Sequence, residues 1–183
     1  MRTIRVAILG HGRSGREIHA RFFRQDNRYE LVAVVDPIVR RRELAERDFG
    51  CETYEDHLPL LKRDDIDLVV DATPSHLHQP IAVDLMRHGF NVLQEKPIAA
   101  TRAQVDELQR VIAETGRVYA IFLQSRYNPQ FIKVREVAES GVLGRLVCIK
   151  IAVNGYGRRW DWQTLQENVA GSLYNTGPHP VGH

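Results

Sequence analysis

Apolar residues in the first two thirds of the chain form short continuous runs that alternate with segments of helical periodicity. The continuous runs, typical of buried parallel strands, span 3–9, 31–35, 67–72, 91–93 and 118–123. The segments between them predict helices over 16–24, 40–49, 81–87 and, after a cap at Thr101, to about residue 114. This alternation predicts an α/β fold: a doubly wound parallel sheet, covered on both faces, in a first domain over residues 1–124.

The pattern changes character after residue 124. Residues 129–139 show helical spacing, 146–153 form an apolar run typical of a strand, and 155–167 are rich in Gly, Arg and Trp and predict a loop. One strand and one or two helices bury too little apolar surface for an independent core. We therefore expect residues 125–183 to be the incomplete start of a second, open-sheet α/β domain.

Composition narrows the class of protein. Of the 183 residues, 43% are hydrophobic and 26% charged, which is enough apolar material for a buried core. The net charge of +2 gives no reason to expect nucleic acid or an anionic membrane as the main partner, and no apolar run approaches the roughly 20 residues of a membrane span. Cys51 and Cys148 share no metal or redox spacing, so we expect free thiols, a cytoplasmic protein and no metal site.

A glycine-rich turn supplies the first candidate chemistry. Gly10, Gly12 and Gly15 match G-x-G-x-x-G, with Arg13 and Ser14 between them, where a predicted strand ends and a predicted helix begins. The first glycine allows a tight turn, the second lets the backbone approach a pyrophosphate, and the third lets helix and strand pack closely. The helix N-terminus then holds the phosphates. The context predicts a Rossmann dinucleotide site formed by these five residues.

Asp36 ends the second strand about 20 residues after the turn, where an acid accepts hydrogen bonds from the adenosine ribose. A carboxylate there repels a 2′-phosphate, so NAD is favoured as cofactor. Arg40 and Arg41 follow closely and leave NADP possible. The structural alternative is a glycine turn without a ligand, with Asp36 capping a helix.

Six motifs occur in order along the chain. They are Gly10–Gly15 with His19, Asp36, Ala72-Thr73-Pro74 with His78, Glu95-Lys96-Pro97, Arg126-Tyr127-Asn128-Pro129, and Gly171–His179. In this order they resemble the Gfo/Idh/MocA oxidoreductases, over essentially the whole chain. The resemblance implies an N-terminal Rossmann domain followed by an α/β domain whose large open sheet commonly forms a dimer or tetramer interface.

The resemblance implies that Lys96 lies beside the nicotinamide and the substrate hydroxyl and is catalytic. A lysine that follows a buried strand and precedes Pro97 is also a candidate for desolvation and a lowered pKa, which suits proton transfer. From the residues alone, the alternative is a surface lysine paired with Glu95. The resemblance further implies cofactor contacts for Lys96 itself and for Thr73, Pro74, His78 and Glu95.

The second half of the implied site is residues 170–179. If this segment is helical, Asn175 and His179 share a face, since they are four residues apart. The resemblance implies that His179 exchanges the substrate hydroxyl proton. Many family members have Asp where this chain has Asn175, and an amide cannot take a proton at neutral pH, so Asn175 is expected to orient the substrate or His179. The alternative for His179 is a solvated histidine.

Four further residues are candidate substrate contacts: Arg126, Tyr127, Arg159 and Trp160. Arginine and aromatic side chains hold polyhydroxylated or anionic ligands by hydrogen bonding and stacking. The cluster that contains Arg159 and Trp160 also suits a loop anchor or an interface patch.

The activity implied is hydride transfer between NAD(P) and a secondary alcohol or ketone of a sugar, cyclitol or related polyol, by a homo-oligomer in its full-length form. Two alternatives stay open. One is a related enzyme that uses NAD transiently to cleave a glycosidic bond, and the other is a non-catalytic, NAD-binding regulatory protein.

Overall fold

The computed structural model describes residues 2–152 and 160–182. The chain divides into two compact units, Met1–Ile121 and Phe122–His183.

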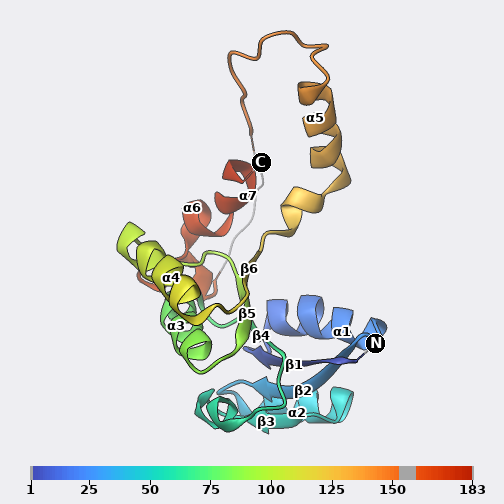
Figure 1. Cartoon of the computed structure of the whole chain (residues 1–183), viewed down its shortest axis with the longest axis vertical. Helices are drawn as coiled ribbons and strands as arrows, with labels where there is room; N and C mark the ends of the chain where they lie inside the picture. The colour runs from blue at the N-terminus through green and yellow to red at the C-terminus, as the bar shows by residue number, and fades with distance from the viewer. Residues whose placement is uncertain (1, 153–159, 183) are drawn as a thin grey trace. The chain divides into compact units, whose positions relative to one another are not determined.

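The first unit is built on a six-stranded sheet of order β3-β2-β1-β4-β5-β6 (Figure 1). The strands are β1 Ile4–Leu9, β2 Tyr29–Val35, β3 Glu52–Tyr54, β4 Leu68–Asp71, β5 Asn91–Glu95 and β6 Tyr119–Phe122. Strands β1 to β5 are parallel to their neighbours. The strand order reverses between β1 and β4, which confirms the doubly wound fold and places a ligand crevice at the carboxyl ends of the strands.

Helices fill the crossovers of this sheet. They are the π-helical η1 Arg13–Ala20, continuous with α1 Arg21–Gln25, then α2 Val39–Phe49, α3 His78–Arg87 and α4 Arg102–Thr115, with 3-10 turns η2 Leu58–Lys62 and η3 Ser75–Leu77. Helix α4 begins in a capping box, in which Thr101 and Gln104 each bond the other's backbone. Gly116 ends α4 in a left-handed conformation, as the sequence predicted.

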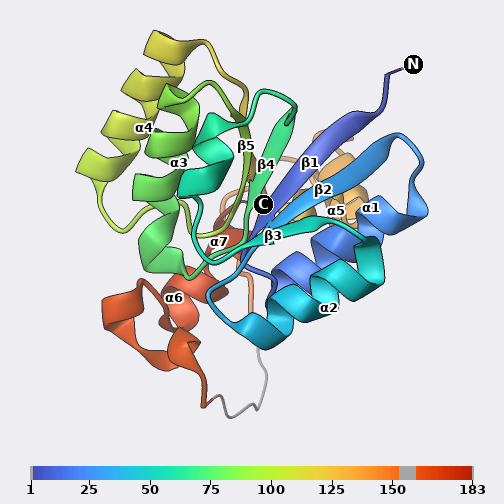
Figure 2. The same cartoon turned by 90° about the horizontal axis from the view of Figure 1, so that it is seen from below.

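The core forms two layers, one on each face of the sheet. Along β1, Val6 and Ile8 pack with α1 and α2, whereas Ala7 and Leu9 pack with η2, α3 and α4. Figure 2 shows α1 and α2 side by side on one face, and α3 beside α4. All four β1 residues are almost fully buried, which explains why the strand is a continuous apolar run rather than an alternating one.

The regular structure among the described residues of the second unit after Phe122 is helical. It contains η4 Gln124–Tyr127, α5 Pro129–Glu139, η5 Trp162–Thr164, η6 Gln166–Asn168, α6 Gly171–Asn175 and α7 Pro178–Val181. Asn128 caps α5 by accepting a hydrogen bond from the Gln130 N–H at 3.0 Å. Among the hydrophobic residues described in this unit, Ala170 alone is fully buried, so the unit has little core of its own.

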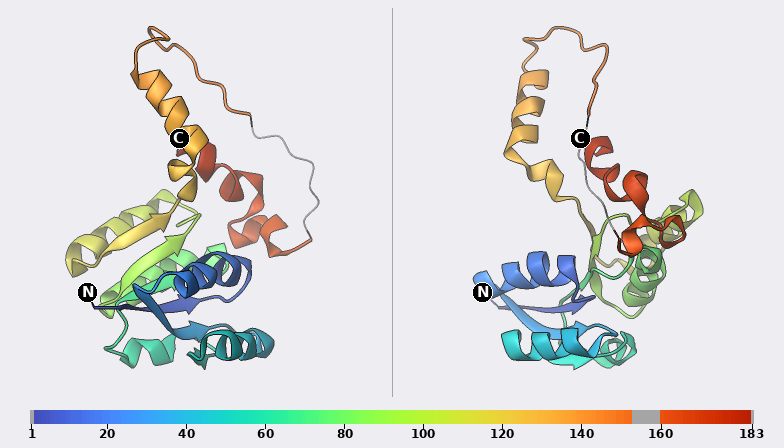
Figure 3. Two further views of the ribbon diagram at one scale, coloured as in Figure 1. Left: turned by 90° about the vertical axis from the view of Figure 1, so that its right-hand side faces the viewer. Right: turned by 180° about the vertical axis from the view of Figure 1, so that it is seen from behind.

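The strand predicted over 146–153 is wrong for residues 146–152, which carry no regular structure. Figure 3 shows the chain after α5 as an extended loop, and Val147 and Ile149 in it are 80% and 71% exposed. A strand is stabilised by pairing with a neighbour. The described residues contain a single sheet, and this segment is not part of it. Its apolar residues therefore have strand propensity but no partner to pair with.

Candidate cofactor and catalytic site

The glycine turn lies between β1 and η1, as its spacing predicts. Gly10 has φ +84°, and a Cβ there would lie 2.5 Å from the Ala72 carbonyl oxygen. A Cβ on Gly15 would lie 1.8 Å from the Gly10 carbonyl oxygen. Both positions therefore exclude a side chain for reasons internal to the fold.

Gly12 differs, because a Cβ there would meet nothing closer than the Arg41 guanidinium at 3.6 Å. The protein itself leaves room for a methyl group at this point. The space lies directly before the N-terminus of η1, where unpaired N–H groups favour an anion. A bare glycine at this position fits the close approach of a cofactor pyrophosphate.

A cavity of about 450 Å³ adjoins the turn. Its lining is predominantly basic: His11, Gly12, Arg13, Arg16, Glu17, Ile38, Arg40, Arg41 and Leu44. Four guanidinium groups against one carboxylate give this cavity an electrostatic preference for a polyanion. The charge of the lining thus agrees with the sterics of the turn in favouring a dinucleotide.

Asp36 is buried beneath this cavity. Its Oδ2 accepts hydrogen bonds from the His11 N–H at 2.8 Å and from Arg41 Nη1 at 3.3 Å, and its Oδ1 accepts one from the Ile38 N–H at 2.9 Å. The carboxylate thereby ties the glycine turn to the start of α2. Because Arg41 covers it, a ribose that bonds Asp36 must share that carboxylate with a guanidinium.

His11 is a site residue that the sequence analysis did not identify. It is almost fully buried, and its Nδ1 lies 3.0 Å from the Arg41 carbonyl oxygen. Burial lowers the pKa of His11, so the ring is neutral, donates from Nδ1 and leaves Nε2 as an acceptor. Within the described residues Nε2 has no hydrogen-bond partner. The only signal in the sequence was its place inside the glycine motif.

Lys96 follows the last residue of β5, at the carboxyl end of the sheet, and is partly buried. The preceding Glu95 is buried, and its Oε1 accepts a hydrogen bond from Nε2 of the equally buried His19 at 3.0 Å. The following peptide bond, to Pro97, is cis. Glu95 is thus engaged with η1, while its cofactor contact stays a prediction.

His78 connects two of the predicted motifs. Its Nδ1 lies 2.6 Å from the Pro97 carbonyl oxygen and its Nε2 lies 2.8 Å from the Thr73 carbonyl oxygen. The ring is 1% exposed. A carbonyl only accepts hydrogen bonds, so both ring nitrogens are directed at acceptors within the protein. Thr73 and Pro74 are partly exposed and remain candidates for direct cofactor contact, whereas His78 lies behind them.

A second buried polar group lies beneath Thr73. Asp71 ends β4, accepts hydrogen bonds from the Thr73 N–H at 3.0 Å and hydroxyl at 2.6 Å, and accepts another from Gln94 Nε2 at 2.8 Å. Burial, with Asp71 nearby, raises the pKa of Tyr119. These residues interrupt otherwise apolar strands, which was the available signal for them. They fix the loop that carries Thr73 and Pro74.

In the second unit, Asn175 and His179 do not share one continuous helix. Asn175 ends α6 and His179 is the second residue of α7, because Pro178 lacks the N–H needed to continue a helix. The Asn175 amide donates to the Gln163 carbonyl oxygen at 3.2 Å. His179 Nδ1 lies 3.0 Å from the Ser125 hydroxyl oxygen.

The predicted substrate contacts also belong to this unit. Arg126 Nε donates to the Gly182 carbonyl oxygen at 3.1 Å. Tyr127 and Trp160 are 80% and 85% exposed. Arg159 lies outside the described residues. The roles of all four stay predictions.

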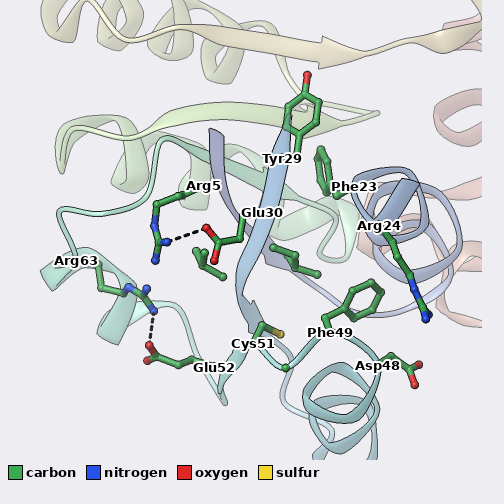
Figure 4. Close-up of a pocket in the computed structure, with 13 residues that line it drawn as sticks. Arg5, Phe23, Arg24, Tyr29, Glu30, Asp48, Phe49, Cys51, Glu52 and Arg63 are labelled. Carbon is green, nitrogen blue, oxygen red and sulfur yellow. Dashed lines mark hydrogen bonds and ion pairs between the residues drawn. The ribbon is translucent and has the colours of Figure 1, made fainter. Parts of the chain in front are cut away.

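A different cavity, of about 480 Å³, lies at the amino-terminal ends of β1 and β2 and is shown in Figure 4. Two ion pairs lie in its lining, Arg5 with Glu30 at 2.9 Å and Arg63 with Glu52 at 3.3 Å. Burial raises the pKa of the Cys51 thiol in its wall to about 11, so that thiol is not a reactive nucleophile at neutral pH. The cavity is at the edge of the sheet opposite to the ligand crevice of this fold.

The described residues contain neither a membrane-spanning helix nor a metal-binding cluster. No helix there is long and apolar enough to cross a membrane. In that same part of the chain, no three His, Cys, Asp or Glu side chains are grouped so that they could hold a metal ion.

Known proteins resemble this chain over its full length. It is 30% identical over 181 residues to 2,7-anhydro-N-acetylneuraminate hydratase from Mediterraneibacter gnavus, a match that covers 96% of this chain and 47% of that protein. It is 27% identical over 182 residues to scyllo-inositol 2-dehydrogenase (NADP(+)) IolW from Bacillus subtilis, covering 98% of this chain and 50% of that protein. The chain thus spans about half the length of these relatives.

The comparison of structures and the family match point to the same class of protein. The solved structure of the oxidoreductase yvaA from Bacillus subtilis matches with a TM-score of 0.86 at 26% identity, covering 98% of this chain and 50% of that one. Residues 4–123 match the family described as "Oxidoreductase family, NAD-binding Rossmann fold". The chain therefore belongs to the Gfo/Idh/MocA family of oxidoreductases.

Proposed function

We propose that the protein is an NAD(P)-dependent oxidoreductase that transfers hydride between the nicotinamide and a secondary alcohol or ketone of a sugar, cyclitol or related polyol. One observation carries this: Lys96, after β5, lies at the same carboxyl edge of one sheet as the glycine turn after β1 and Asp36 after β2. A dinucleotide seated across that edge runs from the adenosine end at Asp36 toward the β5 side of the switch point.

Bound NAD(P) supplies the hydride acceptor or donor. In the oxidative direction the substrate carbon loses hydride and its hydroxyl loses a proton, and Lys96 in its amine form accepts that proton. In the reductive direction the Lys96 ammonium returns it to the forming alkoxide. We assign His179 as a second acid–base group and Asn175 as an amide that orients the substrate.

The names of the relatives support a polyhydroxylated substrate. The Bacillus subtilis protein is named for scyllo-inositol, a cyclitol, and the Mediterraneibacter gnavus protein for a sugar derivative. Arg126, Tyr127, Arg159 and Trp160 are the proposed substrate contacts, because arginine and aromatic side chains suit such ligands.

The hydratase relative favours a second candidate function, in which NAD accepts and returns hydride within one catalytic cycle. Product formation without net accumulation of NADH identifies that version. A third candidate, a non-catalytic NAD-binding protein, predicts saturable cofactor binding with no turnover on any polyol tested.

The test compares Lys96→Ala with Lys62→Ala, a change at an exposed lysine of η2. NAD and NADP binding are measured by calorimetry and turnover by NADH absorbance across a panel of cyclitols and sugars. We expect Lys96→Ala to abolish turnover and keep cofactor binding, and Lys62→Ala to change neither. Full activity in Lys96→Ala removes the catalytic role of Lys96.

We further propose that the protein is a cytoplasmic dimer or tetramer. The exposed apolar side chains of Val147, Ile149 and Ile151 support association, since burying exposed apolar surface favours it. Light scattering after size-exclusion chromatography measures the oligomer directly. A monomer at micromolar concentration contradicts the proposal.

A further inference from the structure

Two buried histidines hold the residues on either side of Lys96. On one side, His19 from η1 donates to the Glu95 carboxylate at 3.0 Å. On the other side, His78 from α3 lies 2.6 Å from the Pro97 carbonyl oxygen. His19 and His78 are 3% and 1% exposed, so neither ring can make these contacts through water.

The contacts of His78 are specific to an imidazole. Its second nitrogen lies 2.8 Å from the Thr73 carbonyl oxygen, so one ring spans the loop after β4 and the loop after β5. A side chain with one hydrogen-bonding end can reach only one of the two carbonyls. The ring therefore couples the position of Pro97 to that of Thr73, which Asp71 holds from below by two hydrogen bonds.

We propose that His19 and His78 are positioning residues that together hold Glu95, through its side chain, and Pro97, through its carbonyl, and thereby fix the placement of the Lys96 amine. The proposal rests on the function proposed above for Lys96. Proton transfer requires the donor and acceptor atoms to be within hydrogen-bond distance, and a displacement of about 1 Å reduces turnover by about 100-fold. Two anchors on adjacent residues restrict such displacement more than the strand end alone does.

His57 provides a matched control. It also connects a loop to α3, through a hydrogen bond from Nε2 to the Asp84 carboxylate at 2.9 Å, but it does not contact the residues that flank Lys96. Replacing it removes one partly buried histidine–carboxylate contact elsewhere in the same unit. Effects that reflect general loss of stability appear in His57→Asn as well.

The direct measurement observes the Lys96 amine. The chain has four lysines, Lys62, Lys96, Lys133 and Lys150, so ¹³C-dimethylation of the amines gives a simple spectrum, and Lys96→Arg assigns the signal of Lys96. We expect His78→Asn and His19→Asn each to change the chemical shift of the Lys96 signal, with the other lysines unchanged. His57→Asn leaves Lys96 unchanged. An unmoved Lys96 signal in both folded variants overturns the proposal.

Kinetics supply the second readout. We expect His78→Asn to lower kcat by about 10- to 100-fold while KM and the Kd for the cofactor stay within about twofold. Equal losses in His57→Asn and His78→Asn overturn the positioning role. The spectrum is recorded on the 183-residue chain without turnover, so it decides the positioning role even if Lys96→Ala retains activity and the proposed function fails.

Discussion

Replacing Arg41 with alanine tests how the first unit chooses between NAD and NADP. The Arg41 guanidinium lies 3.3 Å from the Asp36 carboxylate, at the point where the adenosine 2′ position is expected. The Arg41 side chain is 44% exposed and the Asp36 side chain 1%, and Asp36 also accepts hydrogen bonds from the His11 and Ile38 N–H groups, which stay in place when Arg41 moves. Arg41 can therefore exchange this carboxylate for a phosphate at a small cost in free energy.

A charge-assisted hydrogen bond to a 2′-phosphate contributes about 1.5–3 kcal/mol, which corresponds to roughly 10- to 150-fold in Kd. In Arg41→Ala the phosphate also faces an uncovered Asp36 carboxylate. We therefore expect the Kd for NADP to rise at least about tenfold. The Kd for NAD should change much less, because NAD carries no 2′-phosphate and Asp36 keeps its hydrogen bonds from the His11 and Ile38 N–H groups.

Isothermal titration of the 183-residue chain with NAD and with NADP measures both values, and Arg40→Ala, which lines the same cavity, is the matched control. Raising the salt concentration should reduce the NADP effect, because an exposed ion pair is screened. Equal weakening of NAD and NADP by Arg41→Ala would refute the assignment of Arg41 as the 2′-phosphate contact. Undiminished NADP binding would refute it as well.

Further changes test the turn and the acid stability of the first unit. Gly12→Ala should leave the melting temperature within about 2 °C, since the site has room for a methyl group, yet raise the Kd for NAD at least about tenfold. Gly15→Ala should fail to fold, because its Cβ would overlap the Gly10 carbonyl oxygen. Circular dichroism measures the folding of both variants, and calorimetry measures NAD binding. Hydrogen bonds from Arg63 hold the pKa of Asp65 below its usual range, so this pair stabilises the fold above the unfolded pKa of about 4, and the stability is lost as pH falls through the folded pKa. Asp65→Asn should thus lower the free energy of unfolding by up to about 1 kcal/mol at pH 7. Below about pH 4, the free energy of unfolding measured by urea titration should fall less steeply with pH in this variant than in the unchanged protein. An unchanged pH profile contradicts this.

Much of the first unit follows from local sequence features. The apolar runs locate β1, β2, β4, β5 and β6, and the glycines that end helices mark their boundaries. Strand β3 was not predicted, because its three residues, Glu52–Tyr54, contain no apolar run and form a strand by pairing with Ala33–Val35. The opposite error occurred over 146–152, where an apolar run predicted a strand but the segment has no neighbouring strand to pair with. Pairing is a property of the neighbour as well as of the segment.

The candidate site divides in the same way. The glycine turn, Asp36 and Lys96 were predictable, because short spacings place them at strand ends. The contacts of His19 with Glu95 and of His78 with Pro97 join residues 76 and 19 positions apart, and no local pattern encodes which buried histidine meets which loop. The hydrogen bond from Arg41 to Asp36 depends on the orientation of the arginine side chain. The sequence showed only that a basic residue lies nearby.

The buried carboxylates of the first unit identify the functional edge of the sheet independently of the glycine motif. Asp36, Asp71 and Glu95 each lie at the carboxyl end of a strand, and each is less than a tenth exposed. Desolvating a carboxylate costs free energy that its hydrogen bonds offset only in part, and apolar residues would often serve stability equally well. At the amino-terminal edge, by contrast, the pair of Arg5 with Glu30 stays solvated. Buried, hydrogen-bonded carboxylates thus lie at one edge of the sheet. We expect this where the residues serve to preorganise a site rather than to stabilise the fold.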